Sequence, residues 1–147
     1  MYELLEEQID ELLKEEDSLA AMCNVFAFIY HNFDVINWVG FYFYKKDELV
    51  LGPFQGKVAC TRIPIGKGVC GTAYQHNQLL NVADVHDFAG HIACDADSKS
   101  ELVVPLYSNG KKMGVLDIDS PILSRFDSED EYFFSNIANK IAKKISA

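Results

Sequence analysis

The apolar positions of the first 33 residues recur with a helical period. Between residues 2 and 16 they fall on one side of a helix, at Leu4, Leu5, Ile9, Leu12 and Leu13. Asp17 and Ser18 break this pattern and can cap a second helix that runs to about Asn32. That second segment, LAAMCNVFAFIYHNF, is apolar nearly all round. We therefore expect it to be largely buried, with Cys23 as a core thiol.

A strand pattern replaces the helical one from Trp38 onward. In WVGFYFY, the apolar residues at 39, 41 and 43 alternate with glycine at 40 and tyrosine at 42 and 44. The segment KKDE then turns the chain into LVLGPF, so this stretch predicts a β-hairpin. Further short strands are expected at residues 58–65 (VACTRIPI) and in LLNVAD, with a short helix in GTAYQHN. The segments LVVPLYS and KMGVLDIDS flank Asn109 and Gly110, a pair that strongly favours a hairpin turn.

The chain closes with another predicted helix, which Asp127 or Ser128 can cap. Helices at both ends therefore surround about six strands, mostly joined by hairpins. This order predicts one α+β domain over residues 1–147, with N-terminal helices in 1–33, the sheet and its loops in 38–120, and the C-terminal helix in 128–147. The terminal helices should pack on one face of a central antiparallel sheet.

Charge and hydropathy exclude several classes of partner. The net charge of −9 argues against nucleic acid and against anionic membranes, because little in the chain would neutralise phosphates. No apolar run approaches the roughly 20 residues that span a bilayer. The N-terminal segment MYELLEEQIDELLKEED is acidic, unlike a signal or transit peptide. We therefore expect a cytoplasmic protein whose four cysteines are reduced.

The segment 84–106, DVHDFAGHIACDADSKSELVVPL, is the candidate centre of the chemistry. Cys94 lies in a loop of small and polar residues, three positions after His91, where side chains are presented rather than packed. Loops of this length are typically functional. Cys60 and Cys70 also lie between short apolar runs near turn glycines. The cysteines form no Cys-x-x-Cys pair, which argues against zinc bound by Cys60, Cys70, His91 and Cys94, so no metal is expected.

Carboxylates lie close to this segment and in the last predicted strand. Asp117 and Asp119 interrupt the buried-looking run GVLDIDS and, two residues apart on a strand, project from the same face. A buried carboxylate is costly, so such a placement usually has a use. Together with Glu101 they predict an acidic pocket in which burial and like charge raise carboxyl pKa values.

Four motifs carry a family resemblance: WVGFYFY, GPFQGKVACTRIPIGKGVCGTA, DVHDFAGHIACDADSKSELVVPL and MGVLDIDSP. They closely resemble the free methionine-(R)-sulfoxide reductases, which are built on a GAF domain. The resemblance implies that Cys94 is the nucleophile, that Cys60 is the favoured resolving thiol and that Cys70 is a second one. Which of Cys60 and Cys70 reacts first stays open. Cys23 lies outside the motifs and receives no catalytic role.

The same resemblance assigns a substrate pocket. It makes Glu101, Asp117 and Asp119 the substrate-binding carboxylates, some holding the sulfoxide oxygen and others the ammonium group. Trp38 and Tyr42 match the pocket aromatics, where an indole face can receive the S-methyl group. Backbone amides around residues 92–94 are expected to bind the substrate carboxylate.

The resemblance implies reduction of free L-methionine-(R)-sulfoxide to methionine. A thiolate attacks the sulfoxide sulfur, a sulfenic acid forms, a second thiol converts it to a disulfide, and thioredoxin reduces that disulfide. No metal or organic cofactor is expected, and a homodimer is expected by analogy. The alternative is a non-catalytic GAF module that binds a small ligand or senses redox state. Three clustered thiols would be a liability in such a module, because they are open to oxidation.

Overall fold

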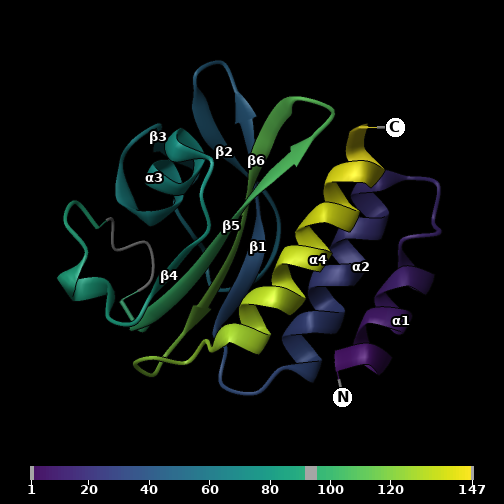
Figure 1. Cartoon of the computed structure of the whole chain (residues 1–147), viewed down its shortest axis with the longest axis horizontal. Coiled ribbons are helices and arrows are strands. Elements are labelled where there is room, and N and C mark those ends of the chain that lie inside the picture. Colours follow the sequence, from purple (N-terminus) through teal and green to yellow (C-terminus); the bar gives the residue numbers. More distant parts are fainter. Residues whose placement is uncertain (1, 92–95, 147) are drawn as a thin grey trace.

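The protein is built on one central sheet flanked by helices (Figure 1). The computed structural model describes residues 2–91 and 96–146. In chain order the elements are α1 (Tyr2–Leu12), α2 (Ser18–Asn32), β1 (Trp38–Lys45), β2 (Glu48–Gly56), β3 (Arg62–Pro64), α3 (Gly68–His76), β4 (Leu80–Val82), the 3₁₀ helix η1 (Val85–Asp87), β5 (Ser100–Ser108), β6 (Lys111–Ser120) and α4 (Ser128–Ser146).

The sheet has six strands in the order β3-β2-β1-β6-β5-β4, and neighbouring strands are antiparallel. Both predicted hairpins are present, β1 with β2 and β5 with β6. Asn109 and Gly110 form the second turn with φ values of 54° and 76°, the left-handed conformation that favours this residue pair. The middle of the sheet is therefore β1 and β6, which lie far apart in the sequence and pair with each other.

Alternation along the central strands divides the core into two clusters. Val39 and Phe41 of β1 join the cluster that the helices cover, whereas Trp38 and Tyr42 join a second cluster on the other face. Figure 1 shows α2 and α4 side by side against one face of the sheet with α1 beside them, and α3 on the opposite side. The terminal helices thus pack on one face, as the sequence predicted, and leave the other face to α3 and the long loops.

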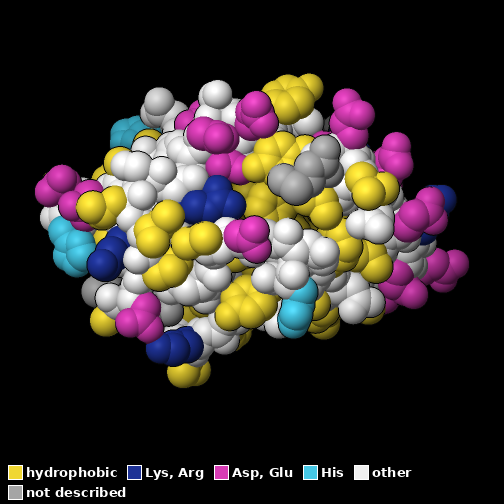
Figure 2. Space-filling view, turned by 90° about the horizontal axis from the view of Figure 1, so that it is seen from below, with side chains coloured by type: hydrophobic (Ala, Val, Ile, Leu, Met, Phe, Trp, Pro, Cys, Tyr) yellow, Lys and Arg dark blue, Asp and Glu magenta, His cyan; other side chains and the backbone are white. Residues whose placement is uncertain are grey.

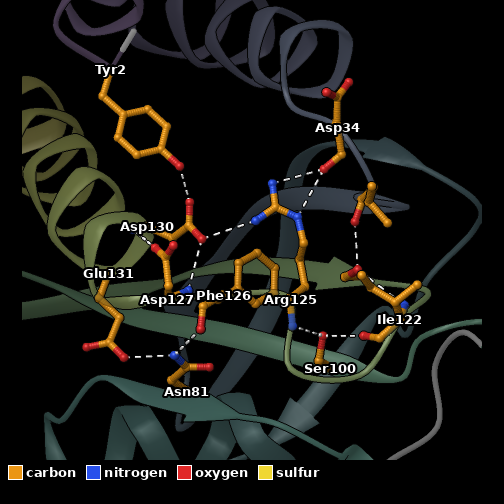
Figure 3. A network of polar contacts seen from close by, with 12 residues as sticks. Tyr2, Asp34, Asn81, Ser100, Ile122, Arg125, Phe126, Asp127, Asp130 and Glu131 are labelled. Carbon is orange, nitrogen blue, oxygen red and sulfur yellow. Dashed lines mark hydrogen bonds and ion pairs between the residues drawn. The ribbon is translucent and has the colours of Figure 1, made fainter.

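A buried polar network fixes the start of α4 to the start of α1 (Figure 3). The hydroxyl of Tyr2 donates to the carboxylate of Asp130, which is 1 % exposed. The guanidinium of Arg125 lies 3.1 Å from the same carboxylate and also donates to the carbonyl oxygen of Asp34. Asp127 accepts from the backbone N–H of Asp130 at 2.9 Å, so Asp127 caps the helix, as the sequence predicted.

Three predictions about the helices were wrong. The helix predicted for residues 2–16 ends at Leu12, because the following bonds, Lys14 N–H to Glu11 and Glu15 N–H to Leu12, tighten into a 3₁₀-type turn. The helix predicted at GTAYQHN begins earlier, at Gly68, which supplies the positive φ of 62° at its first residue. Cys23 is exposed on α2, since the residues of that helix that face the core are Ala21, Met22, Val25, Phe26 and Ile29.

The strand predicted over residues 58–65 is limited to Arg62–Pro64, so Cys60 lies in a connection rather than on a strand. Side chains from β1 satisfy the carbonyl groups of this connection. The indole N–H of Trp38 donates to the carbonyl of Lys57 at 3.2 Å, and the hydroxyl of Tyr42 donates to the carbonyl of Cys60 at 3.0 Å. Because these backbone acceptors are already bonded, they need no neighbouring strand.

The surface is strongly acidic at one end. Figure 2 shows acidic side chains gathered at the end of the molecule that α1 forms, and the exposed acidic residues of this helix are Glu3, Glu7, Asp10 and Glu11. Within the described part of the chain, none of the helices is both long and apolar enough to cross a membrane.

Candidate active site

A pocket lies on the face of the sheet opposite the terminal helices, between the ends of β1, β5 and β6 and the start of α3. Its lining brings together six of the residues predicted from the sequence: Trp38, Tyr42, Cys70, Glu101, Asp117 and Asp119. Four elements contribute them, and the sequence separates the first from the last by about eighty positions. The predicted convergence on one pocket is therefore present for these side chains.

Strand register explains why the three carboxylates meet. Glu101 on β5 is paired with Asp119 on β6, and Asp119 is paired on its other side with Trp38 on β1. Two residues earlier, Asp117 is paired with Gly40 and with Val103. Residues directly opposite one another on antiparallel strands project from the same face. The carboxylates thus form one acidic corner beside the indole of Trp38.

Cys70 of α3 also borders the acidic corner. It is the third residue of α3, and its Sγ lies 3.8 Å from Oε2 of Glu101, to which the thiol donates. Burial raises the pKa of the Cys70 thiol well above its ordinary value, and the neighbouring charges of Asp117, Glu101 and Asp119 raise it further. Cys70 therefore carries its proton at neutral pH and donates it rather than acting as a thiolate.

Asp117 lies at the centre of the acidic corner. It is 5 % exposed, and its Oδ1 has no hydrogen-bond partner among the described residues. Burial raises the pKa of this carboxyl well above its usual range, and Asp119 and Glu101 add to the effect through like charge. The raised pKa agrees with the prediction for a crowded, water-poor carboxylate cluster.

The aromatic side of the pocket is formed by Trp38 and Tyr42, each 2 % exposed. Their ring centroids are 5.9 Å apart in a stacked arrangement, and Phe54 stacks on Trp38 at 5.2 Å. Burial raises the pKa of Tyr42, and the negative charge of Asp117 raises it further. The hydroxyl therefore stays protonated and keeps its hydrogen bond to the Cys60 carbonyl. The two aromatics line the pocket and also hold the connection that carries Cys60.

The other predicted thiols are placed differently. Cys60 lies in the connection between β2 and β3, and its sulfur is disulfide-bonded, so the expectation that all four cysteines are reduced was wrong for this residue. Cys94, the predicted nucleophile, lies outside the described residues, as do the backbone amides of residues 92–94 that we expect to bind the substrate carboxylate. His91, which precedes them, lines the pocket.

Several pocket features were missed by the sequence reasoning. Gly40 has no side chain where a Cβ would lie 2.4 Å from the Cβ of Phe54 and 2.8 Å from the indole of Trp38, so only glycine leaves room for this stack. Asn37 donates to Ser98 at 3.1 Å, which ties the start of β1 to the segment after Cys94. Gly40 had a signal, a glycine inside a strand pattern, which marks close approach of another group. Asn37 and Ser98 had none.

Metal donors within the described residues include one compact group. Atoms of Cys70, Glu101 and Asp117 lie within 4.8 Å of one another, and all three residues are buried. This set differs from the cysteine and histidine set considered from the sequence, because it combines one thiol with two carboxylates.

The fold and the pocket define a class of protein. The chain matches the family described as GAF domain over residues 5–145, so it is a GAF-domain protein. Similar proteins indicate which kind of GAF-domain protein this is. The chain is 48 % identical to the free methionine-R-sulfoxide reductase of Escherichia coli over 99 % of its own length and 88 % of the relative's.

Solved structures agree with that relationship. The structure of fRMsr of Staphylococcus aureus in complex with substrate superposes with a TM-score of 0.92 at 51 % identity, covering 98 % of this chain and 95 % of that one. The free methionine-R-sulfoxide reductase from Neisseria meningitidis, in complex with its substrate, gives a TM-score of 0.94 at 42 % identity, covering 99 % and 88 %. The chain belongs to the free methionine-R-sulfoxide reductase family, which confirms the resemblance seen in its motifs.

Proposed function

We propose that the protein reduces free L-methionine-(R)-sulfoxide to L-methionine and takes its electrons from thiols. The observation that carries this proposal is the meeting of an aromatic pair, a buried carboxylate cluster and a free thiol in one pocket. The relatives whose structures hold their substrate support it.

The pocket suits the two ends of this substrate. The acidic corner of Glu101, Asp117 and Asp119 offers negative charge to an ammonium group and polar atoms to a sulfoxide oxygen. The apolar faces of Trp38 and Tyr42 suit an S-methyl group through sulfur–aromatic contact. A methionine sulfoxide within a peptide lacks the free ammonium and carboxylate groups, so this recognition selects the free amino acid.

Asp117 is the carboxyl best placed to donate a proton to the sulfoxide oxygen. It lies between Glu101, Asp119 and Cys70, it is shielded from water, and its raised pKa keeps a proton available at neutral pH. Glu101 and Asp119 then serve mainly to hold the ammonium group and to keep the Asp117 proton in place by their negative charge.

Cys94 and Cys60 carry out the redox steps in turn. The Cys94 thiolate attacks the sulfoxide sulfur, and Asp117 gives its proton to the sulfoxide oxygen. The substrate's sulfur–oxygen bond breaks as that oxygen passes with its proton to the Cys94 sulfur, so Cys94 becomes a sulfenic acid and methionine is released. The Cys60 thiol then attacks that sulfenic acid, which forms a disulfide and releases water. The disulfide-bonded state of Cys60 and the raised pKa of Cys70 support Cys60 as the first resolving thiol and Cys70 as the second.

The remaining parts of the proposal concern partners. A dithiol protein of the thioredoxin type reduces the disulfide by exchange and restores both thiols. We propose that the enzyme works in the cytoplasm, where such dithiols are kept reduced. The reaction as written needs no bound metal or organic cofactor. A homodimer is proposed by analogy with the fold alone.

The test is NADPH consumption in an assay coupled to thioredoxin and thioredoxin reductase, with separate R and S epimers of free methionine sulfoxide. We expect turnover of the R epimer only, its loss in Cys94→Ser, and full activity in Cys23→Ser. Cys23 is the matched control because it is an exposed cysteine on α2 and lies outside the motifs. Absence of turnover by folded, pre-reduced protein would overturn the proposal and favour the ligand-binding module.

A further inference from the structure

Three buried donor groups of the pocket, one thiol and two carboxylates, lie close together. Cys70 of α3, Glu101 of β5 and Asp117 of β6 place their donor atoms within 4.8 Å of one another, and all three are buried. Among the described residues that line the pocket, none is a lysine or an arginine. A group of this kind can bind a cation once the thiol and carboxyl protons are released.

The separation of the donors fits a small ion. Sγ of Cys70 lies 3.8 Å from Oε2 of Glu101. A tetrahedral zinc ion, with bonds of about 2.3 Å to sulfur and about 2.1 Å to oxygen, holds such atoms about 3.6 Å apart. The thiol and the carboxylate are therefore already close to the separation that coordination requires, and a small side-chain movement completes it.

A second observation points to a ligand. Asp117 is 5 % exposed, and its Oδ1 accepts from no group in the described part of the chain, although a buried carboxylate oxygen normally has a partner. This oxygen belongs to the carboxylate that shares the pocket with Cys70 and Glu101. A metal ion at their centre would satisfy it.

The identity of the donors selects the ion. Calcium and magnesium prefer oxygen ligands alone, whereas a thiolate with carboxylates suits zinc or cadmium. Three protein ligands leave a fourth coordination position open to the pocket, which water can occupy.

From this geometry we propose that Cys70, Glu101 and Asp117 bind Zn²⁺ reversibly, and that the bound ion excludes the substrate. Binding of the ion depends only on these three side chains. The exclusion of substrate rests on the proposed function, because the ion would occupy the acidic corner assigned there to the ammonium group. Zinc then acts as a competitive inhibitor and not as a cofactor.

The first experiment measures binding without any assay of activity. Reduced, metal-free protein is titrated with Co²⁺, whose thiolate charge-transfer absorption reports a metal–sulfur bond, and Zn²⁺ is then added to displace it. We expect one Co²⁺ per chain and a charge-transfer band that Cys70→Ser abolishes and Cys23→Ser leaves unchanged. Asp117→Asn keeps the thiol and should weaken binding by more than roughly 10-fold, because it removes a direct ligand and even the loss of an outer-shell partner costs about 10- to 100-fold. Circular dichroism checks that each variant is folded.

The second experiment measures competition. Added Zn²⁺ should raise the KM for the sulfoxide with kcat unchanged. A charge-transfer band that persists in folded Cys70→Ser would assign the metal to other thiols and overturn the inference, as would full Co²⁺ affinity in Asp117→Asn. Metal binding that depends on Cys70 in a protein without turnover would uphold the site and overturn the proposed function instead.

Discussion

The ammonium group of Lys57 lies 2.6 Å from a carboxylate oxygen of Asp97, and this ion pair joins two loops on either side of the pocket. Lys57 follows β2 and is three residues before Cys60, while Asp97 is three residues after Cys94. The hydrogen bond from Lys57 lowers the pKa of Asp97, so the pair is ionised at neutral pH.

The first prediction concerns this ion pair. Lys57→Ala should lower kcat/KM for the sulfoxide by roughly tenfold, because the pair holds together the segments next to both reacting thiols. The thermal midpoint should hardly change, since both side chains are largely exposed and such pairs contribute little to stability. Lys14→Ala is the matched control, because it removes an exposed pair with Glu11 on α1. Equal kinetics for the two variants would show that the loops need no such link.

The second prediction concerns Asp117 and pH. Its pKa is raised in the folded protein, so folding favours the protonated form, and stability is lost as pH rises from the unfolded value of about 3.9 through the raised folded value. Asp117→Asn should therefore raise the melting temperature at neutral pH, by about 2–4 °C for each kcal/mol gained. The difference should disappear below about pH 4, where the carboxyl is protonated in both states.

The measurement is a set of thermal melts from acidic to neutral pH in buffer with a chelator. Asp87→Asn serves as the control, because Asp87 is an exposed carboxylate in η1. The same Asp117→Asn protein should lose most of its reductase activity despite its higher stability. A neutral melting temperature equal to that of the unaltered protein would mean that the Asp117 carboxylate costs the fold nothing.

The third prediction concerns thiol reactivity. Burial and three neighbouring carboxylates raise the pKa of Cys70, so it should resist iodoacetamide at pH 8, whereas the exposed Cys23 should react readily. Peptide mass spectrometry after timed labelling compares the two thiols in one sample. In Asp117→Asn the Cys70 thiol should react faster, since one of the charges that raise its pKa is removed. Equal rates for Cys23 and Cys70 in the unaltered protein would contradict the buried placement.

The fourth prediction separates two roles of Tyr42. Tyr42→Phe keeps the ring that lines the pocket but removes the hydrogen bond to the Cys60 carbonyl, a loss of about 0.5–1.5 kcal/mol of stability. Formation of the disulfide should slow, and a sulfenic-acid probe should label the variant more strongly after exposure to the sulfoxide. Tyr44→Phe is the control, because it removes an exposed hydroxyl that bonds Asp47. Unchanged probe labelling would exclude a positioning role for the hydroxyl.

Periodicity was enough to predict most of the fold. Alternation in β1 and the Asn109–Gly110 turn correctly predicted two hairpins, because both signals are local. Local signals failed for residues 58–61, where the sequence reads as a strand. Bonds from Trp38 and Tyr42, some twenty residues earlier, keep the chain there out of the sheet. Such long-range competition leaves no trace in a short window of sequence.

Six of the residues that line the pocket were predicted from the sequence, but their arrangement was not. The spacing of Asp117 and Asp119 put them on one face, and register then placed Glu101 opposite Asp119. The separation of Cys70 from Glu101 depends on how α3 docks on the sheet, which no pattern in the chain specifies. Gly40 shows the same limit, since its need for glycine arises from Phe54 on the neighbouring strand.

The division of the core into two clusters on opposite faces of one sheet has a consequence for laboratory evolution. Substitutions on the core-facing sides of α2 and α4, such as those at Phe26 or Ile137, change the stability of the fold without contacting the pocket. Substitutions at Val103 or Val115 change the packing of the cluster that also contains Trp38, Tyr42 and Cys70. A mutant library aimed at bulkier sulfoxides should therefore start from a variant that is already stabilised in the helix-covered cluster. Stabilising substitutions there leave the substrate preference unchanged.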